Sequence, residues 1–65
     1  MEMCEAKAIV VEDDGEKVVM EDVAFLWFKD GKPVLRSLLG EEVVFENYEV
    51  EGVDFVHHTI RLRLR

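Results

Sequence analysis

The single cysteine, Cys4, is the residue of this sequence with the most informative chemistry. No other cysteine occurs among the 65 residues, so no disulfide can form within one chain. A thiolate suits nickel, copper(I) or zinc, although one thiolate alone makes a poor site. A twofold dimer would bring two copies of Cys4 together, and two thiolates with backbone or terminal nitrogens form a square-planar set typical of Ni(II) or Cu(II). A small hydrophobic residue without a ligand role is the alternative interpretation.

Two adjacent histidines, His57 and His58, fall in a predicted turn. Either one could be a metal ligand or a group that titrates near neutral pH. No Cys-x-x-Cys or His-x-His pattern lies nearby, so a turn histidine that hydrogen-bonds to the backbone is the favoured interpretation. His58 is a reserve ligand only, because its turn would have to fold back to the start of the first strand.

The charged residues form two acidic clusters and one basic row. The acidic clusters, 12–14 and 41–51, do not have the spacing of an EF-hand calcium loop, which favours a solvated acidic surface. The basic row could contact phosphate or RNA. Pairing with acids on the neighbouring strand, including Glu49 and Glu51, is the favoured interpretation. The row occupies one face of the last predicted strand: Arg61, Arg63 and Arg65.

The composition argues against several classes of function. The only serine, Ser37, lies within a predicted strand without the Gly-x-Ser-x-Gly pattern, and the 4 glycines are scattered rather than gathered in a phosphate-binding loop. A domain this small has little room for a substrate pocket, so we predict that the protein is not an enzyme. The net charge of -7 makes nucleic-acid binding unfavourable. No apolar run approaches the ~20 residues of a membrane span, and no leader peptide is recognisable, so we expect a cytoplasmic protein.

Short apolar runs separated by turn signals predict an all-β protein. Asp14-Gly15 and Asp30-Gly31 are hairpin-favouring dipeptides, Pro33 should open a strand or lie on an edge, and Gly52 should bend one. Six or seven short antiparallel strands predict one domain over residues 1–65, a small closed SH3-like or Sm-like barrel. The expected strands cover residues 4–11, 17–20, 23–29, 34–39, 42–45, 48–54 and a last strand from Thr59.

The run Val23 to Phe28 is apolar on both of its alternating faces. A half-exposed strand would alternate apolar and polar residues, so one of these faces can line the core while the other needs a cover. A second copy of the chain would supply this cover, and we therefore predict a homodimer. A loop or a terminus of the same chain is the alternative cover.

Several segments in the same order along the chain resemble the CooT-like family of small nickel-binding accessory proteins, which are tied to carbon monoxide dehydrogenase maturation. The resemblance implies a small SH3-like barrel, a homodimer, and Ni(II) bound at the dimer interface. The ligand cysteine of that family directly follows the initiating methionine, and its match here is Cys4 after Met3. Met1 and Glu2 depart from the pattern. The resemblance rests on residues 3–8, 12–15, 21–23 and 53–62.

Three functions therefore stay open. The first is a nickel-binding dimer that delivers or stores Ni(II) for a nickel enzyme or its maturation proteins, with Cys4 as the ligand. The second is a small RNA-binding Sm-like barrel, which only the arginine row favours. The third is a metal-free domain that recruits a protein partner.

Overall fold

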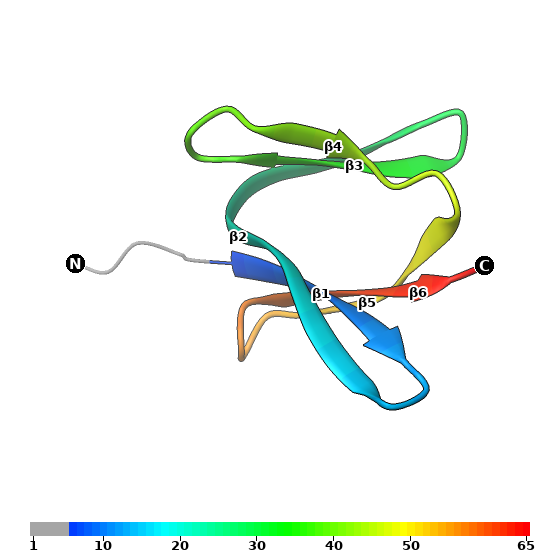
Figure 1. Cartoon of the computed structure of the whole chain (residues 1–65). Coiled ribbons are helices and arrows are strands. Elements are labelled where there is room, and N and C mark those ends of the chain that lie inside the picture. The colour runs from blue at the N-terminus through cyan, green and yellow to red at the C-terminus, as the bar shows by residue number, and fades with distance from the viewer. Residues whose placement is uncertain (1–5) are drawn as a thin grey trace.

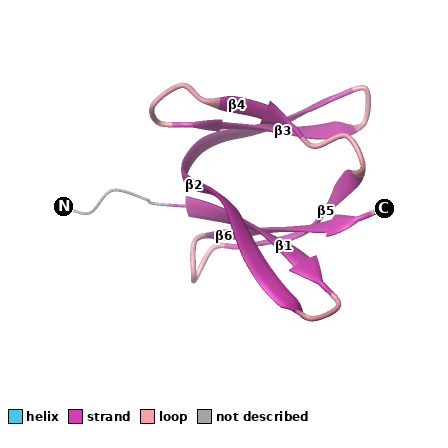
Figure 2. Cartoon of the chain, viewed as in Figure 1, coloured by secondary structure: helices cyan, strands magenta, loops and turns pink. Residues whose placement is uncertain are grey.

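The computed structural model describes residues 6–65, and all of their regular structure is β-strand (Figures 1 and 2). The strands form one six-stranded sheet in the order β4-β3-β2-β1-β6-β5, which curls into a half-barrel of SH3-like form. The predicted all-β class is thus confirmed. The strands are β1 (Ala6–Glu12), β2 (Gly15–Lys29), β3 (Lys32–Ser37), β4 (Glu42–Val44), β5 (Tyr48–Asp54) and β6 (Thr59–Leu64).

The hairpin turns follow from residues that tolerate a left-handed backbone. Asp30 and Gly31 have φ angles of 53° and 78°, and they join β2 to β3 through the pair Lys29↔Lys32. Positive φ at both central residues is the geometry that matches the twist of the flanking strands. The first hairpin also forms, but its central residues are Asp13 and Asp14, since Gly15 already pairs with Glu12.

The predicted strands 17–20 and 23–29 are one continuous strand, β2, so the prediction of a break at Glu21-Asp22 was wrong. Asp22 has a φ of 54°, and the register with both neighbouring strands shifts beside it. A single left-handed residue bends a strand without ending its ladder, and aspartate tolerates this conformation better than most residues. The bend turns β2 from β1, its partner in the first half, towards β3, its partner in the second (Figure 1).

The first and last strands pair in parallel, from Lys7↔Thr59 to Val11↔Arg63. The expectation of antiparallel pairing throughout was wrong for this pair, because the curl of the sheet brings β6 alongside β1 in the same direction. The two end strands, β4 and β5, are not neighbours in the sheet. The rings of Phe45 and Tyr48 meet edge to face between them, with centroids 6.0 Å apart, so side chains rather than a ladder narrow this opening.

The core lies on the concave side of the curled sheet. Leu35 and Leu62 are completely buried at its centre, and Leu26 and Val50 pack against it from the side. The alternation predicted for the last strand holds for Ile60 and Leu62 but fails at the end of β6, where Leu64 is exposed. The buried cluster comprises Ala8, Val10, Met20, Val23, Leu35, Ile60 and Leu62.

Replacement of Leu62 by alanine should destabilise the protein strongly, because its side chain is fully buried and the cavity left behind cannot collapse completely. We expect the free energy of unfolding to fall by about 2–5 kcal/mol. Leu64→Ala on the same strand is the control, since Leu64 is 65% exposed, and it should cost about 0.5 kcal/mol or less. Urea unfolding followed by circular dichroism measures both. Equal losses in the two variants would contradict the placement of the core.

Candidate functional site at the start of the first strand

The predicted ligand Cys4 lies outside the described residues, so the candidate site is defined here by the surroundings of Ala6, where β1 begins. Ala6 pairs with Val23 of β2 on one side. On the other side the amide of Lys7 donates a hydrogen bond of 3.0 Å to the carbonyl oxygen of His58. The β5–β6 turn therefore does fold back to the start of β1, which the sequence alone did not establish.

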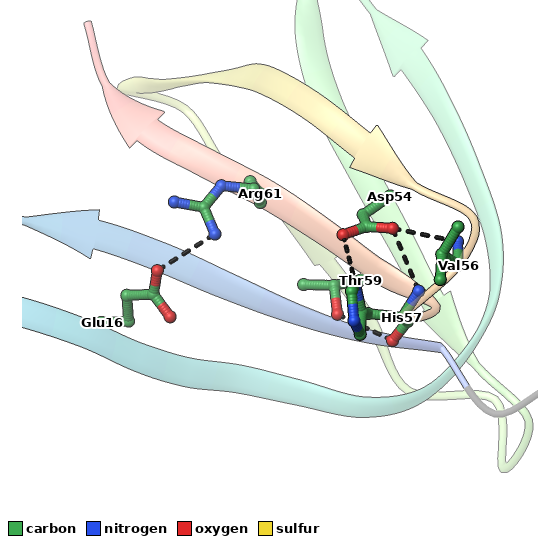
Figure 3. A network of polar contacts seen from close by, with 6 residues as sticks. All are labelled: Glu16, Asp54, Val56, His57, Thr59 and Arg61. Carbon is green, nitrogen blue, oxygen red and sulfur yellow. Dashed lines mark hydrogen bonds and ion pairs between the residues drawn. The ribbon is translucent and has the colours of Figure 1, made fainter.

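The carboxylate of Asp54 organises this turn (Figure 3). Its Oδ1 accepts hydrogen bonds from the amides of Val56 at 2.9 Å and His57 at 3.0 Å. Its Oδ2 lies 2.8 Å from Nδ1 of the His57 ring. The hydroxyl of Thr59 donates to the carbonyl oxygen of His57 at 2.9 Å, and His58 closes the turn with a φ of 51°. Side chains from both ends of the turn thus fix its backbone.

These hydrogen bonds change the acidity of Asp54. The bond to the His57 ring, followed by the bond to the His57 amide, lowers the pKa of Asp54 below its ordinary value of 3.8. Each of these contacts favours the ionised carboxylate, which can only accept hydrogen bonds. Sequence reasoning missed Asp54, although an aspartate at the start of a turn commonly accepts hydrogen bonds from backbone amides two or three residues further on.

The two histidines take separate places. The ring of His57 is largely exposed and contacts the Asp54 side chain, whereas the favoured interpretation was a hydrogen bond to the backbone. His58 instead lines an open hollow on the side of Ala6. His58 therefore shares its surroundings with Ala6, whereas His57 lies on the side of Lys7.

The hollow beside Ala6 is mainly apolar. It has a volume of about 310 Å³ and is open to solvent. Phe25 and Phe55 on its wall are 55% and 82% exposed, and Val56 next to it is 80% exposed. A contiguous exposed apolar patch usually marks a site of interaction with another molecule. Its lining consists of Ala6, Val23, Ala24, Phe25, Leu26, Val53, Phe55, His58, Thr59 and Ile60.

The two-sided apolar run of β2 is covered in part by an arginine. Val23 is buried and Leu26 packs on the core, while Phe25 is exposed on the outer face. The guanidinium of Arg36 lies 5.4 Å from the ring centroid of Phe25 and 5.3 Å from that of Trp27. Such a cation–π contact shields part of the outer face. Phe25 is still more than half exposed, so coverage by a second copy stays a prediction.

The arginine row forms ion pairs with acids of the neighbouring strand β5, which confirms the favoured interpretation for Arg61 and Arg63, and Arg61 also reaches an acid of β2. Arg61 lies 3.1 Å from Glu51 and 3.0 Å from Glu16, and the second of these pairs is drawn in Figure 3. Arg63 lies 2.6 Å from Glu49. These hydrogen bonds raise the pKa of both arginines. The guanidinium groups are thus engaged within the chain, which weakens the case for a phosphate-binding row.

Residues 6–65 offer neither a cluster of metal ligands nor a membrane-spanning helix. Among them, no three histidine, cysteine, aspartate or glutamate side chains are arranged to hold a metal ion. In the same range no helix is long and apolar enough to cross a membrane. Ser37 is the only serine of the sequence. Its hydroxyl oxygen accepts a hydrogen bond of 3.2 Å from the amide of Glu41 and so stabilises the β3–β4 turn.

Comparison with known proteins decides the family. The model of the CO dehydrogenase accessory protein CooT matches residues 3–63. This chain belongs to the CooT family. A crystal structure assigned as CooT from Carboxydothermus hydrogenoformans matches the fold with a TM-score of 0.84 and 27% sequence identity, and the match covers 95% of this chain and 98% of that one. Among curated proteins, none matches the chain.

Membership of the CooT family confirms the resemblance seen in the sequence and the prediction that the protein is not an enzyme. The CooT family is one of accessory proteins to CO dehydrogenase, so an enzyme or its maturation system is the partner that this membership indicates. The matched range begins one residue before Cys4 and includes the whole β5–β6 turn.

The Asp54 turn predicts a pH dependence of stability. Because the folded pKa of Asp54 lies below 3.8, its contribution is present above the unfolded pKa and is lost as the pH falls through the folded one. Asp54→Asn keeps an oxygen acceptor for the two amides but loses the charge, and Asp54→Ala loses both. At neutral pH the melting temperature should fall in the order parent, Asn, Ala. The parent and Asn should converge only as the pH falls from 3.8 through the lower folded pKa of Asp54. A parent–Asn difference that persists in acid would contradict this role.

Proposed function

We propose that this chain is a cytoplasmic nickel-binding accessory protein, which delivers or stores Ni(II) for the maturation of a nickel enzyme such as carbon monoxide dehydrogenase. Two copies form a homodimer, and Cys4 of each copy binds the metal at their interface. The observation that carries the proposal is the position of Cys4 within the matched CooT range, two residues before a strand start that borders an exposed apolar hollow.

Covalent geometry limits the distance between Cys4 and this hollow. An extended chain spans at most about 3.6 Å per residue, so the α-carbon of Cys4 is within roughly 7 Å of that of Ala6. A second copy seated on Phe25 and Phe55 would cover the apolar surface beside Ala6 in both subunits. Twofold symmetry would then bring the two copies of Cys4 to a common interface if the axis passes near Ala6.

The chemistry of the ligand set favours Ni(II) over a harder cation. Two thiolates with nearby backbone nitrogens suit a square-planar d⁸ ion, whereas magnesium and calcium prefer oxygen ligands. The net charge of -7 raises the local concentration of any cation. The carboxylates are dispersed over the surface, so they would attract the metal while the thiolates would hold it.

Two other functions receive less support. The RNA-binding alternative rested on the arginine row, and Arg61 and Arg63 are paired with glutamates of β2 and β5. The metal-free interaction domain agrees with the exposed apolar surface but leaves the only thiol of the chain without a role. The nickel titration below separates this third function from the first.

Titration of the reduced protein with Ni(II) should reach one metal per dimer, with a near-ultraviolet thiolate-to-nickel absorption band. Cys4→Ser should abolish both. Binding requires deprotonated thiols, so the affinity should fall as the pH drops below neutral. His58→Asn is the matched control, because asparagine tolerates the φ of 51° at this position. This variant should keep the stoichiometry and the band. Unchanged nickel binding by Cys4→Ser would refute the proposed site.

The dimer interface is tested separately by Phe55→Glu. A charge on the wall of the hollow should oppose burial against a second copy, so this variant should sediment as a monomer of 7.6 kDa. The parent should show about twice that mass. Leu64→Glu makes the same chemical change at an exposed position at the far end of β6 and should stay dimeric. A parent that is monomeric with and without nickel would contradict the dimer.

A further inference from the structure

Within residues 6–65, the first half of β2 has one edge without a strand partner. Residues Gly15–Met20 pair with β1 on one side, and β3 pairs with β2 only from Val23 onwards. None of the backbone hydrogen bonds outside the ladders involves this half of β2 among the described residues. In an antiparallel ladder, alternate residues point their N–H and C=O groups away from the partner strand. About half of the backbone groups of this segment therefore face outward without a strand partner in residues 6–65.

A hollow lined by both apolar and acidic side chains borders this edge. It has a volume of about 400 Å³ and lies between β2 and β4, with Val18, Val19 and Met20 on one side and Val43 on the other. Val18 and Val43 are 46% and 41% exposed, whereas Met20 is buried and Val19 packs against the core. The floor of the hollow is therefore continuous with the core, and its walls are open to an incoming apolar side chain.

Two carboxylates complete the lining of this hollow, Glu21 from β2 and Glu41 from the β3–β4 turn. Other glutamates of the surface have cationic partners: Glu16 pairs with Arg61 and Glu42 with Arg36. No such ion pair involves Glu21 or Glu41 in the described part of the chain. The rim of the hollow is therefore negatively charged and complementary to lysine or arginine.

We propose that this edge and hollow, the β2 groove, bind an extended segment of a partner protein in which apolar and basic residues alternate. The segment adds as a strand to Gly15–Met20 and hydrogen-bonds to its free backbone groups. One of its apolar side chains enters the hollow between Val19 and Val43. Its basic side chains reach Glu21 and Glu41 at the rim. Backbone pairing supplies affinity, and the hollow and the charges supply selectivity.

A second copy of this chain is a poor occupant of the β2 groove. The segment of this chain in which apolar and basic residues alternate is β6, and it already pairs with β1 on one side and β5 on the other. A second copy also carries a net charge of -7, which opposes its approach to an acidic rim. The occupant is therefore a different protein. The CooT family consists of accessory proteins, so the enzyme served or its maturation machinery is where such a segment is expected. The proposal does not depend on nickel binding.

The test uses the ¹⁵N-labelled full chain and a short synthetic peptide of alternating valine and lysine. Titration followed by amide NMR spectra should shift the signals of residues 17–21 and of Val43. Two peptides serve as controls. One has glutamate in place of lysine, and the other is N-methylated at alternate residues so that one edge cannot donate hydrogen bonds. Both should bind at least about tenfold more weakly, because each removes one of the two recognition elements.

A pair of variants tests the site on the protein. Glu41→Lys should weaken binding of the valine–lysine peptide by about tenfold. Glu46→Lys makes the same change in net charge on the β4–β5 turn, outside the lining of the hollow, and should weaken it by less than about twofold. Thermal unfolding establishes that both variants are folded. Equal losses in the two variants, equal binding of the N-methylated peptide, or shifts confined to residues outside the groove would each overturn the proposal.

Discussion

The left-handed residue Asp22 is the constraint on which the rest of this structure depends. It bends β2 so that one strand of 15 residues belongs to both halves of the sheet. The amide of Leu38 donates a hydrogen bond of 2.8 Å to the carbonyl oxygen of Asp22, which ties the β3–β4 turn to the bend. A flat sheet of this size would have one apolar face in water, whereas the curled sheet encloses Leu35 and Leu62.

The same bend explains why so much apolar surface stays exposed. A domain of this size buries only about 60% of the surface of its unfolded chain. The curl encloses one core but leaves a hollow on each side of the middle of β2, one beside Ala6 and Phe25 and the other beside Val19 and Val43. A helix or a longer loop could cover these hollows in a larger protein. Here the described residues have no such element, so partner molecules are the natural cover.

The local features of the fold were predictable and the long-range ones were not. The hairpin at Asp30-Gly31, the strand Tyr48–Asp54 with its irregularity at Gly52, and the pairing of Arg61 with Glu51 all follow from neighbouring residues. Aspartate, however, is common both in turns and at left-handed positions inside a bent strand, so Asp22 was taken for a turn. The parallel pairing of β1 with β6 joins the two ends of the chain and has no local signal. The Asp54 turn was missed because its bonds are made to the backbone and to one ring.

The distribution of charge separates two kinds of attraction on this surface. The arginines of β6 form ion pairs with Glu16, Glu49 and Glu51. These pairs hold the side chains against the sheet, and their opposite charges largely cancel. Within the described part of the chain, Glu21 and Glu41 have no such partner, and they contribute to the net charge of -7. Exposed carboxylates act on any cation over about 8–10 Å at ordinary ionic strength, without selecting among cations.

Selectivity must therefore come from groups with directional chemistry. For the proposed nickel site these groups would be the thiolates of Cys4, and for the proposed partner segment they would be the outward-facing backbone groups of β2. Salt weakens the electrostatic attraction of both the metal ion and the partner segment but leaves the directional bonds largely intact. The metal ion and the segment need not compete, because the two hollows lie on different sides of β2.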